Sequence, residues 1–354
     1  MDIAQLLQLT IQQQASDLHL VVGVPPMLRV HGELQAVPGE PVVAAEKATE
    51  MIFSLLTPQQ KDLLLTNREL DFSYALGNQA RFRVNAYFEK GRLAIELRLI
   101  PAKIKTLEEL RLPKICHSLT ALKQGFVLVT GPTGCGKSST LAAMIEEINA
   151  TRAENILTVE DPIEFLYTPK KSIVSQREMH NDTHSWTVAL KSALREDPNV
   201  VLVGEMRDYD TIAAAITVAE TGHLVFATLH TNSAAQSIDR MIDVFPAHQQ
   251  AQVRQQLASS LEGILSQRLV PSLKGGRVPA IEILLATPAV RNLIREGKSH
   301  QIDSTIQTSS ELGMMTLEMS LAAWVKVGEV TLEVAQSYSL RPQELVRLVR
   351  GNNA

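Results

Sequence analysis

The spacing of hydrophobic residues along the first hundred positions switches between a helical period and a strand period. Helical spacing covers 1–14 and 44–66, and Pro58 opens the second half of the latter stretch. Alternation of hydrophobic and polar residues, the pattern of half-buried strands, is found at 18–22, 28–30, 70–76, 82–88 and 93–99. The last three runs predict a β-meander, and the whole segment predicts a small α+β domain over residues 1–100.

The rest of the chain alternates short hydrophobic runs with helical stretches. Continuous hydrophobic runs, typical of fully buried strands, lie at 126–130, 156–160, 200–204 and 224–229. Such strands, separated by helices, predict a parallel sheet covered on both faces. From about residue 247 the pattern is mostly helical, apart from two strand-like runs at 264–270 and 278–285. We therefore predict a linker over 101–105 and a second, α/β domain over 106–354.

The composition suits two folded domains in a reducing compartment. The chain has 354 residues, of which 45% are hydrophobic, enough for two modest cores. A net charge of −4 and an aromatic content of 4% count against nucleic acid as the main partner, because binding a phosphate backbone needs a basic surface. Cys116 and Cys135 offer neither a disulfide framework nor a zinc site. No apolar run approaches the roughly 18 residues of a membrane span, so we expect a cytoplasmic protein with at most a peripheral membrane role.

The strand at 126–130 runs directly into Gly-x4-Gly-Lys-Ser, the spacing of a phosphate-binding loop. Its glycines permit left-handed torsions and a close approach of backbone N–H groups to phosphates. Lys137 supplies a positive charge, and Ser138 supplies a hydroxyl that suits Mg²⁺. The helical pattern after the loop places the N-terminus of a helix beside the phosphates. The loop is expected to lie at the surface and to pack little. The predicted nucleoside triphosphate site comprises Gly131, Pro132, Thr133, Gly134, Cys135, Gly136, Lys137, Ser138 and Ser139.

Hydrolysis also needs an acid that supports the metal and a group that orients water, both at the carboxyl ends of neighbouring strands. Glu160 ends one predicted strand, and Glu205 follows another directly. We predict that both are catalytic. Asp208, close behind Glu205, has a simpler alternative role as a helix cap.

Two histidines and three arginines are further candidates. His223 and His230 bracket the strand at 224–229 and are predicted to sense phosphate, with a structural role as the alternative. Three arginines lie on the outward face of the meander, where they either provide ordinary surface polarity or reach a phosphate bound by a neighbouring subunit. These are Arg81, Arg83 and Arg98.

Taken together, these residues resemble the motifs of the type II/IV secretion ATPases. The likeness extends over essentially the whole chain, from 15–19 through 81–85 to the tail. The segments that match, in chain order, are the Walker A loop 131–138, the acidic box 160–164, the segment 194–198, the Walker B segment 204–208 and the His box 228–231. The resemblance implies a RecA-like P-loop ATPase core with a small PAS-like N-terminal domain and a helical C-terminal tail.

The same resemblance implies a role for each candidate residue. ATP and Mg²⁺ are the expected ligands, with Ser138 and Glu205 on the metal and Glu160 activating water, although the two glutamates could exchange roles. His230 matches a His-box position, and His223 is a second candidate for this motif. Members of the family work as hexamers, so a homohexamer is expected. The three arginines match positions that face a nucleotide across the subunit boundary, namely Arg81, Arg83 and Arg98.

Within the family, the chain most resembles the pilus retraction ATPases. Extension and secretion relatives carry an additional N-terminal domain and a four-cysteine zinc module, which the two cysteines here cannot form, so no zinc is expected. Residues 289–296 match a retraction-associated signature except at Val290, and Arg291 and Arg295 are expected on the exposed face of this amphipathic helix. The resemblance implies an inner-membrane pilus platform protein and a paralogous retraction ATPase as partners.

Three other functions remain open. The chain could be an accessory retraction ATPase, or a nucleic-acid translocase or conjugation-type secretion ATPase that shares the same core. The acidic net charge gives the translocase little support. A nucleotide sensor without turnover would leave Glu160 and Glu205 without a function.

Overall fold

The computed structural model describes residues 1–30, 32–77, 79–100 and 103–351. The chain forms two compact units, Met1–Lys103 with Pro162–Leu166, and Ile104–Asp161 with Tyr167–Ala354. The linker predicted over 101–105 falls partly outside the described residues, which do not include 101 and 102.

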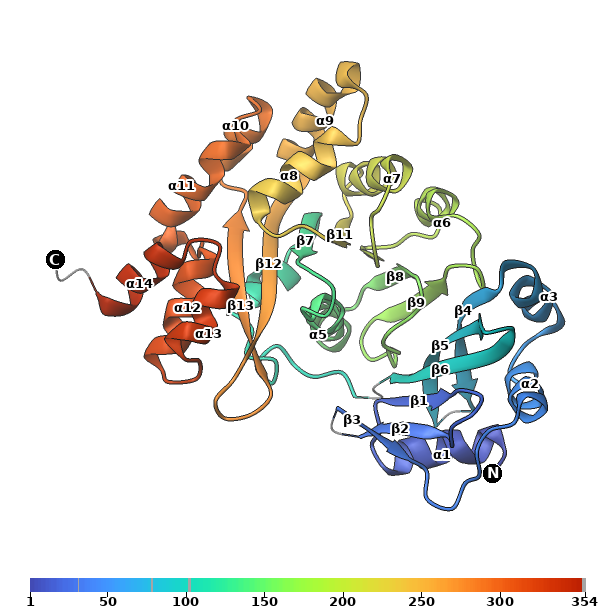
Figure 1. The fold of residues 1–354 in the computed structure, drawn as a ribbon. Helices are drawn as coiled ribbons and strands as arrows, with labels where there is room; N and C mark the ends of the chain where they lie inside the picture. The colour runs from blue at the N-terminus through green and yellow to red at the C-terminus, as the bar shows by residue number, and fades with distance from the viewer. Residues whose placement is uncertain (31, 78, 101–102, 352–354) are drawn as a thin grey trace. The chain divides into compact units, whose positions relative to one another are not determined.

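The first unit is a six-stranded antiparallel sheet with three helices, in the order β3-β2-β1-β6-β5-β4 (Figure 1). Two of its helices begin with a capping box, in which Asp2 or Thr57 and a glutamine three residues later satisfy each other's backbone N–H groups. The inward faces of β5 and β6 form the core with the helices. The elements are α1 (Ile3–Gln12), β1 (Asp17–Leu20), β2 (Met27–Val30), β3 (Glu33–Ala36), α2 (Ala45–Phe53), α3 (Pro58–Asn67), β4 (Glu69–Leu76), β5 (Ala80–Glu89) and β6 (Arg92–Ile100).

The second unit contains a seven-stranded sheet in the order β13-β12-β7-β11-β10-β8-β9. Its strands are parallel except for β13, which returns antiparallel to β12. The elements are α4 (Ile115–Thr120), β7 (Gly125–Thr130), α5 (Lys137–Thr151), β8 (Asn155–Glu160), β9 (Ile173–Glu178), α6 (Trp186–Ala193), β10 (Val200–Val203), α7 (Tyr209–Glu220), β11 (Leu224–Leu229), α8 (Ala234–Asp243), α9 (Ala247–Ser260), β12 (Leu261–Pro271) and β13 (Arg277–Leu285).

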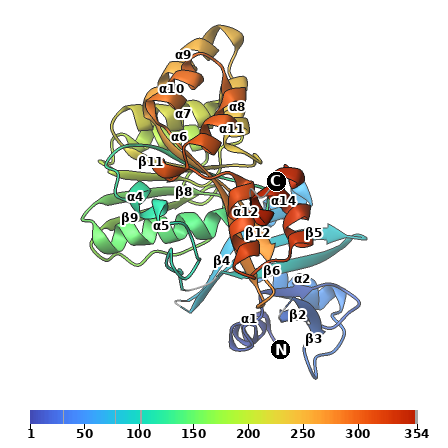
Figure 2. The same cartoon turned by 90° about the vertical axis from the view of Figure 1, so that its left-hand side faces the viewer.

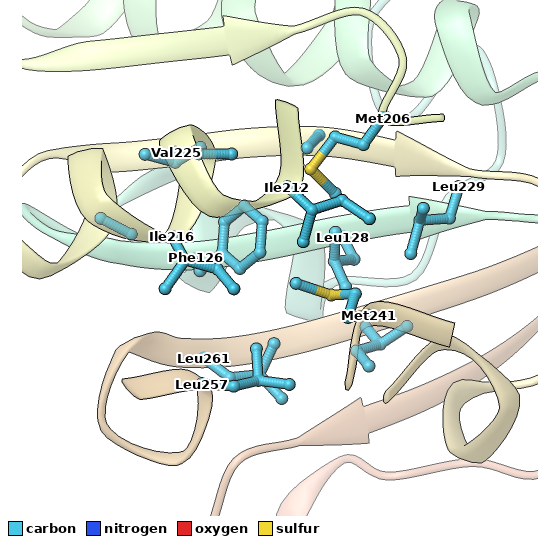
Figure 3. Close-up of a cluster of buried hydrophobic side chains, with 14 of the residues drawn as sticks. Phe126, Leu128, Met206, Ile212, Ile216, Val225, Leu229, Met241, Leu257 and Leu261 are labelled. Carbon is cyan, nitrogen blue, oxygen red and sulfur yellow. The ribbon is translucent and has the colours of Figure 1, made fainter. Parts of the chain in front are cut away.

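Helices cover both faces of this sheet. Figures 1 and 2 show α5 on one face and α6 and α7 on the other. Every residue of β7, β10 and β11 is buried, as the continuous hydrophobic runs predict. Figure 3 shows the core between the sheet and its helices, with Phe126 of β7, Ile212 of α7 and Met241 of α8 packed together. This packing holds the strand ends that carry the candidate site.

The C-terminal region is helical, as predicted. Part of it packs on the β12–β13 hairpin through a separate hydrophobic cluster that includes Val270, Val278 and Leu321. In the described part of the chain, no helix combines the length and the apolar character that crossing a bilayer requires. The elements are α10 (Pro288–Arg295), η1 (Ser299–Gln301), α11 (Ile302–Thr308), η2 (Ser310–Leu312), α12 (Leu317–Lys326), α13 (Leu332–Tyr338) and α14 (Pro342–Arg350).

Candidate active site

The phosphate loop joins β7 to α5, and its backbone adopts conformations that glycine permits. The φ angle is +77° at Gly134 and +89° at Gly136, in the left-handed region. At Gly131, an added Cβ would lie 2.3 Å from the carbonyl oxygen of Gln267, so no larger residue fits. Gly136 is the N-cap of α5, and the first turn of this helix therefore offers unpaired N–H groups and the positive end of its dipole. The loop has the form of a phosphate cradle.

Lys137 folds back over this loop. The residue is only 9% exposed, and its ammonium group donates hydrogen bonds to the carbonyl oxygens of Gly131 at 2.9 Å and Pro132 at 3.2 Å. Cys135 is also buried. The expectation that the loop lies at the surface and packs little therefore holds for Pro132 and Thr133, which are exposed, and is wrong for Cys135 and Lys137, which are buried.

The order of the strands brings the other candidate residues to the same edge of the sheet. Strands β7, β11, β10 and β8 are parallel neighbours, so their carboxyl ends lie together. The phosphate loop follows β7, His230 follows β11, and Glu205 follows β10 after a single glycine. Glu160 is the last residue of β8. The structure thus gathers the phosphate loop, both glutamates and His230 at one edge.

Glu205 lies between an arginine and a histidine. Its Oε2 accepts a hydrogen bond from Arg207 at 2.7 Å, and its Oε1 is 3.2 Å from Nε2 of His230. Burial raises the pKa of Glu205, but the Arg207 hydrogen bond and the charges of Arg207, His230 and Lys137 outweigh burial and lower it below the ordinary value. Burial, together with the Lys137 charge, lowers the pKa of His230. At neutral pH the pair is therefore a carboxylate beside a neutral imidazole.

Glu160 is held more tightly than Glu205. It is 8% exposed, and its Oε1 accepts hydrogen bonds from the hydroxyl of Thr158 at 2.7 Å and the amide of Gln176 at 3.2 Å. An added Cβ at Gly204 would lie 3.2 Å from the Cα of Glu160, so the turn before Glu205 passes directly beside it. Asp208 instead caps α7, accepting the N–H of Thr211 at 2.8 Å, in agreement with its alternative role.

Comparison with known proteins assigns the chain to a family. Residues 77–278, more than half of the chain, match the family described as Type II/IV secretion system protein. The chain belongs to the type II/IV secretion system protein family. The family predicted from the sequence is confirmed, and so is the predicted fold class.

Among its relatives in this family are two pilus ATPases of Pseudomonas aeruginosa. The chain is 48% identical to the type IV pilus retractation ATPase PilT over 343 residues, which is 97% of this chain and 99% of that protein. It is 38% identical to the type IV pilus ATPase PilU over 351 residues, 99% of this chain and 92% of that protein. A crystal structure of the pilus retraction motor PilT with bound ADP is similar at a TM-score of 0.91 and 43% identity, with 98% and 99% of the two chains covered.

The two candidate histidines, His223 and His230, lie at opposite ends of β11. Strand β11 lies between the two histidines, which places them at opposite edges of the sheet, roughly 20 Å apart. Nδ1 of His223 is 3.0 Å from the carbonyl oxygen of Val218. Within this chain, His223 therefore lies at the end of β11 away from the phosphate loop, and its contact with Val218 agrees with the structural alternative.

The three candidate arginines share one face of the sheet in the first unit. Arg83 lies directly opposite Arg98 in the β5–β6 register and is exposed. Arg98 donates to Asp17 at 2.7 Å, and this carboxylate is almost fully buried. Arg81 donates to the hydroxyl of Ser73 at 2.6 Å. Arg98 thus has a structural partner in its own unit, and a role of any of the three at a nucleotide stays a prediction.

Two residues that support the site were not predicted from the sequence. The hydroxyl of Ser237, on α8, lies 2.7 Å from that of Thr231 and 3.4 Å from that of Thr130, so it joins the residue after His230 to the residue before the phosphate loop. Gln267, on β12, hydrogen-bonds to the carbonyl oxygen of Cys135. Neither link to the phosphate loop has a local signal, because Ser237 is 107 positions from Thr130 and Gln267 is 132 positions from Cys135.

Proposed function

We propose that this chain is an ATP-hydrolysing motor that works as a homohexamer and powers type IV pilus retraction. The observation that carries the proposal is the meeting of the phosphate loop, Glu160, Glu205 and His230 at one edge of the sheet. Similarity over nearly the full length to PilT, a pilus retractation ATPase, supports retraction of the pilus as the work that the motor performs. Similarity to the ADP-bound PilT structure supports a nucleotide as the ligand of the loop.

In the proposed reaction, Lys137 exchanges its bonds to loop carbonyl oxygens for bonds to phosphate oxygens, while N–H groups at the start of α5 donate to the same phosphates. Hydrogen bonds from Thr158 and Gln176 hold the carboxylate of Glu160 in place, and this carboxylate orients the attacking water. Glu205 supports the metal, with the exchange of these two roles as the alternative. His230 donates from its neutral ring, which couples Glu205 to the loop after β11.

Mg²⁺ fits the donors that this site offers. The ion prefers oxygen ligands, and Ser138 and Glu205 would provide a hydroxyl and a carboxylate. In the ranges that the structure describes, no group of three or more His, Cys, Asp or Glu side chains is arranged to hold a metal. An ion bound mainly by phosphate oxygens and water does not need such a group. When bound, it would neutralise charge on the phosphates.

The partners follow from the pilus function. The motor acts in the cytoplasm, peripherally at the inner face of the cytoplasmic membrane, on a pilus platform protein. The 38% identity to PilU supports a paralogous retraction ATPase as a further partner. Nucleic acid is not proposed as the main partner, because a chain with a net charge of −4 lacks the basic surplus that such binding needs.

Replacing Lys137 by Ala tests the proposed activity. We expect magnesium-dependent ATP hydrolysis to be lost, because the charge directed at the phosphates is removed. Lys191→Ala, on the exposed side of α6, is the matched control and should hydrolyse ATP at the normal rate. Substantial residual hydrolysis by the Lys137 variant would contradict the assignment.

Two glutamine variants separate catalysis from binding. Glu160→Gln and Glu205→Gln keep the shape of each side chain and remove its charge, so each should slow hydrolysis by about 100-fold while ATP binding persists. A steady-state ATPase assay and a nucleotide titration measure the two properties. Normal rates in both variants would leave only a nucleotide-binding module.

A further inference from the structure

Gln267 makes a two-sided contact with the phosphate loop from the neighbouring strand. It is 2% exposed and lies on β12, one residue beyond the pairing of Ser266 with Thr130 of β7. Its Nε2 donates to the carbonyl oxygen of Cys135 at 2.6 Å, and its Oε1 accepts from the hydroxyl of Thr140 at 2.9 Å. The side-chain amide therefore spans from the loop to the second turn of α5 with both of its polar ends used.

The bond to Cys135 fixes more than one carbonyl oxygen. Because a trans peptide is planar, its C=O and N–H groups point in opposite directions. The carbonyl oxygen of Cys135 points toward Gln267, so the N–H of Gly136 points away from β12. Gly136 is the N-cap of α5, and its N–H is one of the donors that a phosphate-binding loop presents to its anion. The orientation of this donor thus depends on Gln267.

The packing around the loop leaves this peptide little freedom. An added Cβ at Gly136 would lie 3.1 Å from Nε2 of Gln267, and one at Gly131 would lie 2.3 Å from the backbone oxygen of the same residue. Gln267 therefore contacts both ends of the loop, with its backbone at Gly131 and its side chain at Gly136. A buried amide with two partners in such a position is more rigid than a surface contact.

We propose that Gln267 is a positioning residue of the phosphate loop, which holds the Cys135–Gly136 peptide so that the N–H of Gly136 faces the phosphates. This inference rests on the proposed function, in which the loop binds ATP. Gln267 does not touch the nucleotide in this scheme and acts only through the loop backbone. Replacing the Gln267 side chain should therefore weaken the binding of nucleotide phosphates more than it lowers the rate of hydrolysis.

Gln267→Met in the full-length protein is the first test. Met has a similar volume but no donor, so the carbonyl oxygen of Cys135 loses its partner and the peptide can rotate. We expect the affinity for ADP, measured with a fluorescent N-methylanthraniloyl derivative, to fall about tenfold or more, because a hydrogen bond to a charged group is misaligned. KM for ATP should rise more than kcat falls. Gln255→Met, on the exposed surface of α9, is the control and should bind ADP normally.

Gln267→Glu gives a readout that a purely structural role would not produce. The glutamate still accepts from Thr140, but when ionised it opposes the carbonyl oxygen of Cys135, whereas its protonated form can donate to that oxygen. The ratio of the variant's ADP affinity to that of the unaltered protein should therefore be low at high pH and return toward one as pH falls. A ratio that is independent of pH and equal to one would overturn the inference.

The outcomes for the inference and for the proposed function are distinct. Unchanged ADP affinity in both Gln267 variants would overturn the positioning role, and ATP hydrolysis by the unaltered protein would still support the motor. A lowered thermal unfolding temperature with unchanged ADP affinity would likewise overturn it, because it would show a contribution to folding alone. Loss of ADP affinity in both variants would support it even if the unaltered protein bound nucleotide without hydrolysing it.

Discussion

At the scale of single residues, Glu282 is a buried acid that the proposed reaction does not use. It lies on β13, is 2% exposed and accepts the N–H of Ala234, the first residue of α8, at 2.7 Å. Burial raises the pKa of Glu282 from 4.5 to about 7, and the neighbouring carboxylates of Asp303 and Glu318 act in the same direction, while Arg341 and the Ala234 hydrogen bond oppose them. This carboxyl group is therefore easier to bury when it is protonated.

The free energy of unfolding should consequently fall as pH rises from the unfolded to the folded pKa of Glu282. Between the unfolded pKa of 4.5 and the folded pKa of about 7, the folded state binds more protons at Glu282 than the unfolded state does, so the free energy of unfolding decreases as pH rises and then levels off. Glu282→Gln keeps an acceptor for Ala234 and should gain about 2–3 kcal/mol over the parent at pH 8 but little at pH 5. Urea denaturation at the two pH values measures this difference. An equal effect at both would contradict it, and Glu333→Gln, on the exposed side of α13, is the control.

The residues that could be predicted from the sequence are those whose chemistry is contained in one short segment. Lys137, Glu205 and His230 belong to such segments, since each lies in the short stretch of chain that follows a hydrophobic strand. Gln267 could not be predicted, because its partner Cys135 is 132 positions away and an isolated glutamine in a strand has no characteristic spacing. The buried contacts that shape a site are usually of this second kind.

At the scale of elements, α10 shows how a helix face can be misjudged. Arg291 and Arg295 were expected on its exposed face, but only Arg295 is there. The side chain of Arg291 is 22% exposed, and it donates to the carbonyl oxygens of Ala286, Ala258 and Ser259 and to the carboxylate of Glu262. The expectation of an exposed Arg291 is wrong, because the carbonyl groups at the end of α9 have few partners within the helix and the arginine supplies donors for them.

Arg291→Ala should therefore destabilise the protein instead of leaving its folding unchanged. We expect the free energy of unfolding to fall by about 2–3 kcal/mol, because several carbonyl oxygens and Glu262 lose a charged donor together. Arg295→Ala, four residues along the same helix, is the control and should change it by less than about 0.5 kcal/mol. Equal urea midpoints for the two variants would show that Arg291 is not a structural clamp.

The elements themselves were mostly predictable, and the exceptions have physical causes. Strand β9 (Ile173–Glu178) was not predicted, because as an edge strand with polar residues it lacks the continuous hydrophobic run of its neighbours. The order of the strands also could not be derived, since hydrophobic spacing identifies a buried strand without identifying its partners. That order is what brings the phosphate loop beside Glu205 and Glu160.

At the scale of the whole molecule, mixed rings of the proposed hexamer test whether an arginine completes the site of a neighbouring subunit. Arg83 is exposed on its sheet, which suits such a contact but also suits ordinary surface polarity. In a ring that mixes Arg83→Ala with Lys137→Ala subunits, about a quarter of the composite sites would have both residues if the sites form between subunits. We expect ATPase activity to recover partly on mixing, whereas rings of either variant alone stay inactive. Equal inactivity of every mixture would locate the whole site within one chain.

The direction of work is a property of the assembled machine, and the catalytic residues do not determine it, since extension motors need the same ATP chemistry. The 48% identity to PilT, over 97% of this chain, favours retraction. Replacing the chromosomal copy with Lys137→Ala should therefore leave cells with surface pili that fail to withdraw, so twitching motility is lost while assembly continues. Electron microscopy of pili and a twitching assay measure the two outcomes, and reintroduction of the unaltered gene should restore movement. Cells without any pili would instead assign the motor to extension, and cells that twitch normally would make it an accessory to another retraction ATPase.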